Sequence, residues 1–480
     1  MTNARSLLAG AAWTYGAQLV TMVVQFGYAA ITSRLISATG FGAYGVALSV
    51  AALATLLANG GLAQAVGRSQ LLEPARIRGL SLYALILGFT GALGLFVTAD
   101  FWAFLWSVPE SAGLIRWLSM NALVAPWTGL SGGLLRRQGR FKTLAKCVLS
   151  CNLIGMVLGA IAAYIWGSPL ALLVSPIAAQ SGMAIIGLAL NLDIFKGRAK
   201  LSDAKNDINF SWKLTVASLL SYTNINIGKI ATSSTLGAGA LGQWNRADVV
   251  STIPFMQVQT ALIQTVYPEF RHDQYTGRRA RTAWPDLLTL VAWASIPAAG
   301  VAAVVLPYLV PILFGPGWET AAWLAAPFAI FAGLQVVSTV LAAAIEALGR
   351  FRWIWASHLM LMLIYGISAI LMLITHSWIA IISGLLTAQV AQHLLHVILC
   401  WRAGYISLRP LVRGYCEVLI VTISLATLMW LIVFSVQSLS VGLSIVVILL
   451  IVILVLAFLW RVRETLAPVK TARKYGILRS

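Results

Sequence analysis

Arg34, Lys229 and Arg246 are basic residues that lie in or directly beside long apolar segments. A charge inside a membrane-length apolar segment is costly and therefore usually functional. Together these cations could hold an anionic head group in a hydrated cavity. Two other interpretations stay open: Lys229 pairs with Asp248, which would neutralise both side chains, and Arg34 extends its guanidinium to the lipid headgroups.

Uncharged polar side chains occur in the same segments. Gln18 and Gln25 are seven residues apart and share a helix face, and the segment of Lys229 also carries Asn224 and Asn226. They could line a central aqueous pathway, or they could form hydrogen bonds between helices. The sequence thus predicts a pathway whose candidate residues are Gln18, Gln25, Arg34, Asn224, Asn226, Lys229, Arg246 and Asp248.

Other chemistries lack their sequence signatures. The chain has no GxxxxGK[ST] or HExxH pattern. His393 and His396 can share a helix face, but carboxylate partners for a metal are missing, so we interpret them as packing residues. We therefore expect no cofactor, no metal site and no enzymatic activity.

The composition is that of a membrane protein with many spans. Of 480 residues, 60% are hydrophobic and only 10% are charged, with a mean hydropathy of +0.87. Soluble domains are about 25% charged, so a soluble enzyme, a DNA-binding protein, a fibrous protein and a disordered chain are all excluded. The net charge of +19 is spread over many short loops, as in basic cytoplasmic loops, and nucleic acid is not an expected partner.

Charged and Gly/Pro-rich breaks divide the chain into fourteen apolar segments of spanning length. They are residues 8–33, 41–66, 79–99, 113–134, 145–166, 170–192, 211–236, 242–267, 284–312, 321–346, 353–374, 378–401, 414–436 and 439–460. With a cytoplasmic N-terminus, 29 of the 33 Lys and Arg residues fall on the cytoplasmic side. We therefore expect an all-α polytopic membrane protein with about fourteen transmembrane helices, both termini cytoplasmic and an uncleaved first span.

The two halves of the chain resemble each other. Residues 35–44 (LISATGFGAY) align with residues 235–244 (TLGAGALGQW) at an offset of 200. Gly139-Arg140-Phe141 aligns with Gly349-Arg350-Phe351 at an offset of 210. Two six-helix bundles related by a pseudo-two-fold axis along the membrane normal are predicted, which suits alternating access. Their expected bounds are 1–200 and 201–405, followed by two extra helices and a basic cytoplasmic tail in 406–480.

These residues also support a family resemblance. The joint TSRLI…GFGAY (residues 32–36 and 40–44) resembles the joint between the first two helices of bacterial polysaccharide flippases. LGAGALGQWNRA (residues 236–247) resembles the corresponding joint of their second half. Pro254, VYPEF (residues 266–270) and QGRF (residues 138–141) also fit. The chain is thus similar, over most of residues 1–410, to the multidrug/oligosaccharidyl-lipid/polysaccharide exporter superfamily.

The resemblance implies flipping of a polyprenyl-pyrophosphate-linked oligosaccharide across the bacterial inner membrane, from the cytoplasmic to the periplasmic leaflet. The product would enter exopolysaccharide, capsule or O-antigen assembly. The resemblance also implies that Arg34, Lys229 and Arg246 hold the pyrophosphate and sugar while the polyprenyl tail stays among the membrane lipids. Partners implied in the same way are a polysaccharide polymerase and a chain-length regulator.

The chain departs from the pattern at two places. Many relatives carry an acidic residue after the Asn of the seventh span, where this chain has Asn226 and Gly228, so a proton-coupling role is not carried over. Gln18 and Gln25 occupy positions where lipid II flippases carry arginines, which argues against a peptidoglycan precursor. The alternatives are a cation-coupled multidrug antiporter of the same fold and a membrane-embedded enzyme of polysaccharide assembly. The scarcity of carboxylates inside the spans favours an anionic substrate.

Overall fold

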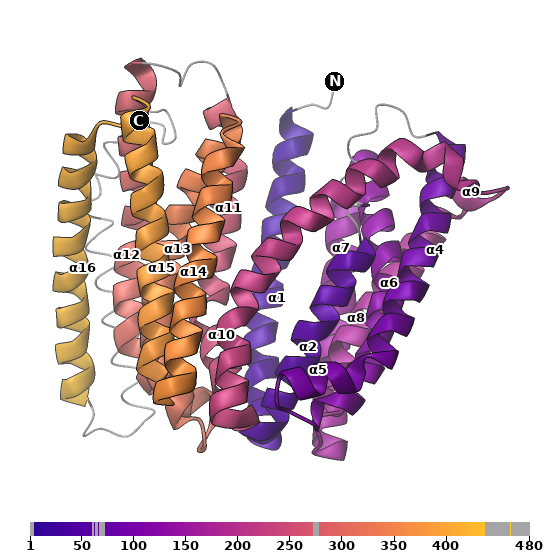
Figure 1. The fold of residues 1–480 in the computed structure, drawn as a ribbon, viewed down its shortest axis with the longest axis horizontal. Coiled ribbons are helices and arrows are strands. Elements are labelled where there is room, and N and C mark those ends of the chain that lie inside the picture. Colours follow the sequence, from indigo (N-terminus) through magenta and orange to yellow (C-terminus); the bar gives the residue numbers. More distant parts are fainter. Residues whose placement is uncertain are drawn as a thin grey trace. The chain divides into compact units, whose positions relative to one another are not determined.

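The computed structural model describes residues 4–59, 62, 66, 73–271, 278–436 and 461. These residues form helices and connecting turns with no β-strand among them, which confirms the predicted all-α class (Figure 1). The chain separates into two compact units. Unit 1 comprises Met1–Arg246, Phe314–Trp318 and Ser368–Trp378, and unit 2 comprises Ala247–Leu313, Glu319–Ile367 and Ile379–Ser480.

Apolar segments bounded by charged or Gly/Pro-containing breaks form the helices of unit 1. They are α1 (Ala4–Leu35), α2 (Ala38–Asn59), α4 (Pro74–Val97), α5 (Ala99–Leu105), α6 (Ser111–Arg137), α7 (Phe141–Trp166), α8 (Ala171–Ala189), α9 (Leu192–Phe195), η1 (Leu201–Ala204) and most of α10 (Lys205–Ser251). Helix α6 is central, because α2, α4 and α8 all pack against it, while α1 packs against α7.

Helix α10 is two helices joined at Gly237. This glycine has φ 84° and ψ 177°. Residues with a Cβ atom are sterically disfavoured in that conformation, whereas glycine adopts it readily. It separates residues 205–236 from residues 238–251, where the sequence predicts one span to end and the next to begin. Figure 1 shows α10 running obliquely from the neighbourhood of α9 to the far ends of α1 and α2.

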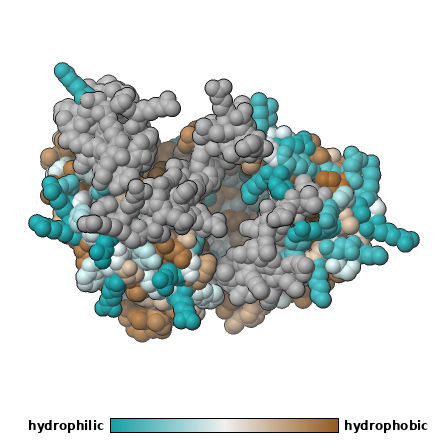
Figure 2. Space-filling model, turned by 90° about the horizontal axis from the view of Figure 1, so that it is seen from above, coloured by the Kyte–Doolittle hydropathy of each residue, from teal (hydrophilic) through white to brown (hydrophobic). Residues whose placement is uncertain are grey.

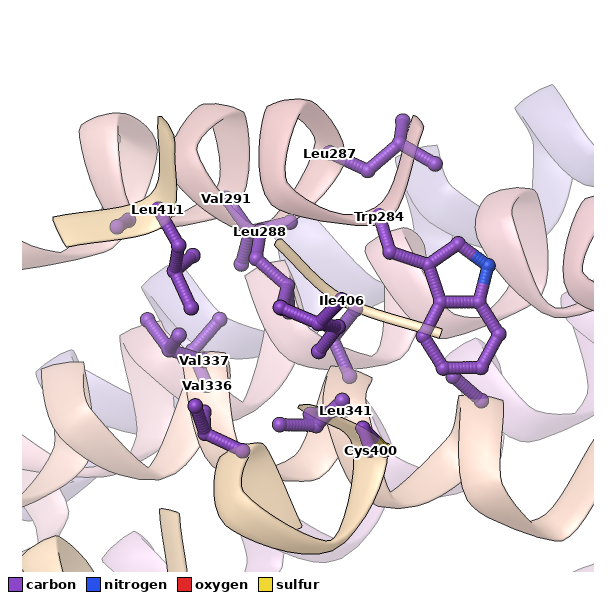
Figure 3. Packing of buried hydrophobic residues seen from close by; sticks show 14 of the residues in the cluster. Trp284, Leu287, Leu288, Val291, Val336, Val337, Leu341, Cys400, Ile406 and Leu411 are labelled. Carbon is purple, nitrogen blue, oxygen red and sulfur yellow. The ribbon is translucent and has the colours of Figure 1, made fainter. Parts of the chain in front are cut away.

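Unit 2 is a bundle around a continuous apolar core. It contains α11 (Ile253–Arg271), most of α12 (Arg278–Phe314), α13 (Glu319–Ala347), most of α14 (Phe351–Thr375), α15 (Trp378–Arg402) and α16 (Leu408–Val436). In Figure 3, Leu288 of α12, Val336 and Leu341 of α13 and Cys400 of α15 point into this core. Trp284 is fully buried and stacks on Tyr405 with ring centroids 5.5 Å apart.

Thirteen of the fourteen predicted spans coincide with helices in the described ranges, and the last, residues 439–460, lies outside them with the basic tail. Nine of these helices are long and apolar enough to cross a membrane, by length and composition. Large apolar side chains such as Phe89 and Ile154 stay about 60% exposed on the flanks, as expected where lipid replaces water. Figure 2 shows hydrophilic side chains gathered on the end face seen from above.

The two sites of the GRF repeat have the same local structure. Gly139 has φ 71° and Gly349 has φ 70°. After α6, the amides of Gly139 and Arg140 donate to the carbonyls of residues 136 and 135; after α13, those of Gly349 and Arg350 donate to residues 346 and 345. Both are Schellman endings in which glycine takes the left-handed position. The tripeptide therefore encodes the same helix ending in both halves, while the bounds 1–200, 201–405 and 406–480 stay a prediction.

Candidate functional site

The candidate site is built around a close crossing of α2 and the second half of α10. A Cβ atom at Gly42 would overlap the carbonyl oxygen of Ala238, and one at Gly242 would overlap the carbonyl oxygen of Ala38. Residues 38 and 42 correspond to residues 238 and 242 at the offset of 200, so each contact is the counterpart of the other, as with contacts across a two-fold axis. Small residues four apart let the backbones approach this closely. The repeated sequence thus has a direct structural reason.

Arg246 lies one turn beyond this crossing and is buried, with 7% of its surface exposed. Its guanidinium carbon lies 3.8 Å from the ring centroid of Phe41 and 5.8 Å from that of Phe314. Tyr28 and Tyr44 are close enough to interact with it electrostatically. Its Nε has no hydrogen-bond partner, and no carboxylate of the described ranges forms an ion pair with it. A cation is therefore held here by aromatic faces instead of an acid.

We define the aromatic site as Phe41, Phe314 and Trp318. Two of its three residues belong to the Phe314–Trp318 segment, which contacts of its own hold in place. The indole N–H of Trp318 donates to the Ser33 carbonyl over 3.0 Å, and its ring meets that of Phe41 edge-on at 5.6 Å. The side-chain amide of Gln243 donates to the Gly317 carbonyl over 2.6 Å. The segment is thereby tied to the end of α1 and to α10.

Arg34 approaches the same segment from α1. Its Cγ lies within 3.6 Å of the position that a Cβ of Gly315 would take. In contrast to Arg246, its side chain is exposed. The structure therefore brings two of the three predicted cations to the Phe314–Trp318 segment, and one of them is buried while the other is exposed.

Lys229, Asn224 and Asn226 lie in the first half of α10, before the kink at Gly237. Asn224 and Asn226 are buried, with 8% and 5% exposed, and the Asn226 amide donates to the Tyr222 carbonyl one turn earlier. The Tyr222 hydroxyl donates to the Ser49 carbonyl of α2 over 2.7 Å, so this stretch packs tightly in the present conformation. Lys229 is half-buried. Its role in substrate binding stays a prediction.

The remaining candidates divide between the two units. Gln25 of α1 is half-buried, and the side chain of Gln18 lies outside the described residues. Asp248 belongs to unit 2, and its pairing with Lys229 stays a prediction. In unit 2, His393 Nε2 lies 3.0 Å from the Tyr415 hydroxyl and His396 is fully buried.

The sequence pattern pointed to Arg246 but not to the aromatic residues around it. Phe41 lies inside the first joint and Arg246 just after the second, so the repeat already linked their neighbourhoods. Trp318 follows the Gly-Pro-Gly turn of FGPGW, residues 314–318. A tryptophan directly after a turn between two apolar segments is the signal that could have pointed to it.

The family model described as polysaccharide biosynthesis protein matches residues 31–323, more than half of the chain and all of the aromatic site. The chain is 24% identical over 334 residues to the lipopolysaccharide biosynthesis protein WzxC of Escherichia coli (strain K12), covering 67% of this chain and 65% of that protein. It is 23% identical to the teichuronic acid biosynthesis protein TuaB of Bacillus subtilis (strain 168), covering 82% of each. The match to the succinoglycan biosynthesis transport protein ExoT of Rhizobium meliloti (strain 1021) is 24% identical and covers 66% of this chain and 65% of that protein. The chain thus spans slightly less than two thirds of two of these relatives.

Among solved structures, the lipid II flippase MurJ in an inward closed conformation aligns with a TM-score of 0.65 at 10% identity, covering 93% of this chain and 98% of that one. A multidrug resistance MATE family transporter in an inward-facing conformation aligns with a TM-score of 0.59 at 14% identity, covering 80% and 97%. At these identities the likeness establishes the fold alone. That fold is one of multi-pass membrane transporters.

Proposed function

Because the chain belongs to the polysaccharide biosynthesis protein family, we propose that it flips a polyprenyl-pyrophosphate-linked oligosaccharide from the cytoplasmic to the periplasmic leaflet. The proposal places the chain in a bacterial inner membrane with both termini cytoplasmic. It assigns the chain no bond-making or bond-breaking step. A polysaccharide polymerase and a chain-length regulator would then act on what it delivers.

The substrate itself sets the physical problem. Burying its charged pyrophosphate and its sugar hydroxyls in hydrocarbon without partners costs many kcal/mol. Its tail is as apolar as the lipid and can stay in the bilayer. A flippase therefore needs an interior that replaces water around the head group and opens to each leaflet in turn.

The observation that carries the proposal is the burial of Arg246 without an acidic partner. A charge of this kind lowers stability unless something else compensates it. In a chain selected for function, such a residue is expected to meet a negative ligand at some stage of its cycle. The pyrophosphate would be that ligand, and Arg34 and Lys229 would complete the cationic cavity.

The crossing at Gly42 and Gly242 is the contact that would open and close during transport. In the present conformation it holds Phe41 over Arg246. Separation of α2 from the second half of α10 would uncover the guanidinium. We propose that this separation belongs to the alternating-access movement, so that the cation is exposed in one state and covered in the other.

The second candidate function is cation-coupled export of drugs or small molecules by the same fold. The likeness to the MATE transporter bears only on the fold and does not favour it. Such antiporters need a buried carboxylate to exchange a proton or sodium ion for the drug. The cation held among aromatic rings here suits an anionic substrate instead.

The test is a flipping assay with the full chain in proteoliposomes. Fluorescent polyprenyl-pyrophosphate-linked oligosaccharide is added, and a membrane-impermeant quencher reports the leaflet that it occupies. We expect exchange between leaflets with the wild-type chain, and loss of most of it in Lys229→Gln. Exchange no faster than in protein-free liposomes would refute the proposal. Drug export from cells in place of lipid flipping would support the second candidate.

A further inference from the structure

A pocket opens at the end of unit 1 where α2, α6 and α8 begin. Its volume is about 530 Å³, within the 300–1,000 Å³ range of small-molecule sites. The residues that line it are Ser37, Thr39, Gly40, Ala43, Glu110, Gly113, Leu114, Trp117, Ser168, Pro169 and Leu170. Helix α6 starts here and ends with Arg136 and Arg137 at its other end, so the charge pattern places the pocket on the outer side.

The lining narrows the class of ligand. A phosphate is disfavoured, because none of the lining residues is basic and the Glu110 carboxylate would repel it. A lipid tail would require a uniformly apolar wall, but three hydroxyl groups and a carboxylate are present, from Ser37, Thr39, Ser168 and Glu110. What fits is an uncharged or amino-substituted polyol that uses hydrogen bonds on one side and an apolar face on the other.

Trp117 provides that apolar face. It is 58% exposed although it lines a pocket, so one side of its indole is open to a ligand. Sugar rings carry C–H groups on one face, which stack on the electron-rich face of an aromatic ring. Carboxylate and hydroxyl oxygens accept hydrogen bonds from the ring hydroxyls. A monosaccharide unit satisfies both requirements at once.

Two glycines shape the space. A Cβ at Gly40 would lie 2.7 Å from Cγ of Pro169, so the α1–α2 joint packs directly on the α7–α8 turn. A Cβ at Gly113 would meet nothing within 4 Å, so this residue leaves the space open. The backbone at Gly113 is ordinary helix, and a larger side chain there would fill the pocket without straining the chain.

We propose that this pocket binds a sugar of the transported oligosaccharide on the outer side, through stacking on Trp117 and hydrogen bonds to Glu110. The inference rests on the proposed function, because that function supplies the glycan. It adds a glycan subsite separate from the cations that would hold the pyrophosphate.

The test measures binding to the purified full chain in detergent by saturation-transfer NMR. The probe is the lipid-free repeat-unit oligosaccharide released from the polysaccharide of the strain that carries this gene. We expect a signal with wild type and its loss in Gly113→Phe, because the phenyl ring occupies the pocket. The matched control is Gly94→Phe, another helical glycine with open space but outside the pocket, which should keep the signal.

Two milder substitutions keep the test valid if Gly113→Phe fails to fold. Trp117→Ala should weaken binding about tenfold, and Trp117→Phe should retain most of it. If Trp117 only anchors the helix at the membrane interface, Trp117→Ala would lower thermal stability with an unchanged NMR signal, and the proposal would be wrong. The same holds if wild type gives no signal or if Gly113→Phe binds like Gly94→Phe.

The flipping assay separates this inference from the proposed function. Wild-type flipping together with absent or pocket-independent sugar binding overturns the subsite and leaves the flippase standing. Pocket-dependent binding without flipping supports the subsite and refutes the flippase.

Discussion

Arg246 and Arg34 carry the same side chain to the same five-residue segment, yet their surroundings are opposite. Arg246 is buried against Phe41 and Phe314, whereas Arg34 lies beside Gly315 in an exposed position. In water a guanidinium is well solvated and contributes little to stability; away from water it needs compensation. Stability and transport should therefore respond differently to removal of each charge.

The largest effect should come from breaking the crossing that holds the covered arginine. Gly42→Val places side-chain atoms onto the Ala238 carbonyl, and backbone cannot move aside as a flexible side chain can. We expect a loss of about 3 kcal/mol in the free energy of unfolding, with little folded protein recovered. Thermal unfolding in detergent measures this. Gly94→Val, which meets nothing within 4 Å, should unfold close to wild type; equal losses in both variants would contradict the crossing.

Removing the covered charge should separate stability from transport. Arg246→Met keeps an unbranched side chain against the aromatic rings and removes the desolvation penalty. We expect the free energy of unfolding to rise by about 1 kcal/mol, while flipping in proteoliposomes falls more than tenfold. A destabilised variant that still flips would show that Arg246 is only a structural residue.

The contact between the guanidinium and the ring of Phe41 can be measured by itself. A double-mutant cycle of Phe41→Leu and Arg246→Met should give a coupling energy of about 1 kcal/mol, the usual size of a desolvated cation–π contact. Phe255→Leu is the control, because this phenylalanine of α11 lies buried in the apolar core of unit 2 and reports the cost of the size change. Additive effects within about 0.3 kcal/mol would mean that the stacking contributes nothing.

The smallest change in stability is expected at the exposed arginine. Arg34→Gln should alter the free energy of unfolding by less than about 0.5 kcal/mol, as is usual for exposed positions. Flipping should still slow several-fold, and less so at high salt, because the lost attraction is screened there. Should Arg34 only reach the lipid headgroups, Gln would leave the flipping rate unchanged.

Periodic and compositional signals were sufficient for most of the fold. Thirteen predicted spans coincide with helices because an apolar run of spanning length can satisfy its backbone in a membrane only as a helix. The break before residue 238 and the matching ends at Gly139 and Gly349 were also readable, since glycine takes left-handed conformations at little cost. Side-chain burial was not readable in this way: the sequence left open whether Asn224 and Asn226 line water or form hydrogen bonds between helices, and the structure shows that both are buried.

The sequence by itself determined that this chain is an all-helical membrane protein with repeated joints and few interior charges, because those properties follow from local composition and spacing. Tertiary structure alone decided that Arg246 faces the ring of Phe41, about two hundred residues earlier, and that α2, α6 and α8 begin around one pocket. Contacts between distant segments depend on how helices cross. A crossing depends on small residues from two helices that are far apart in the sequence, so no local pattern in either helix predicts it alone.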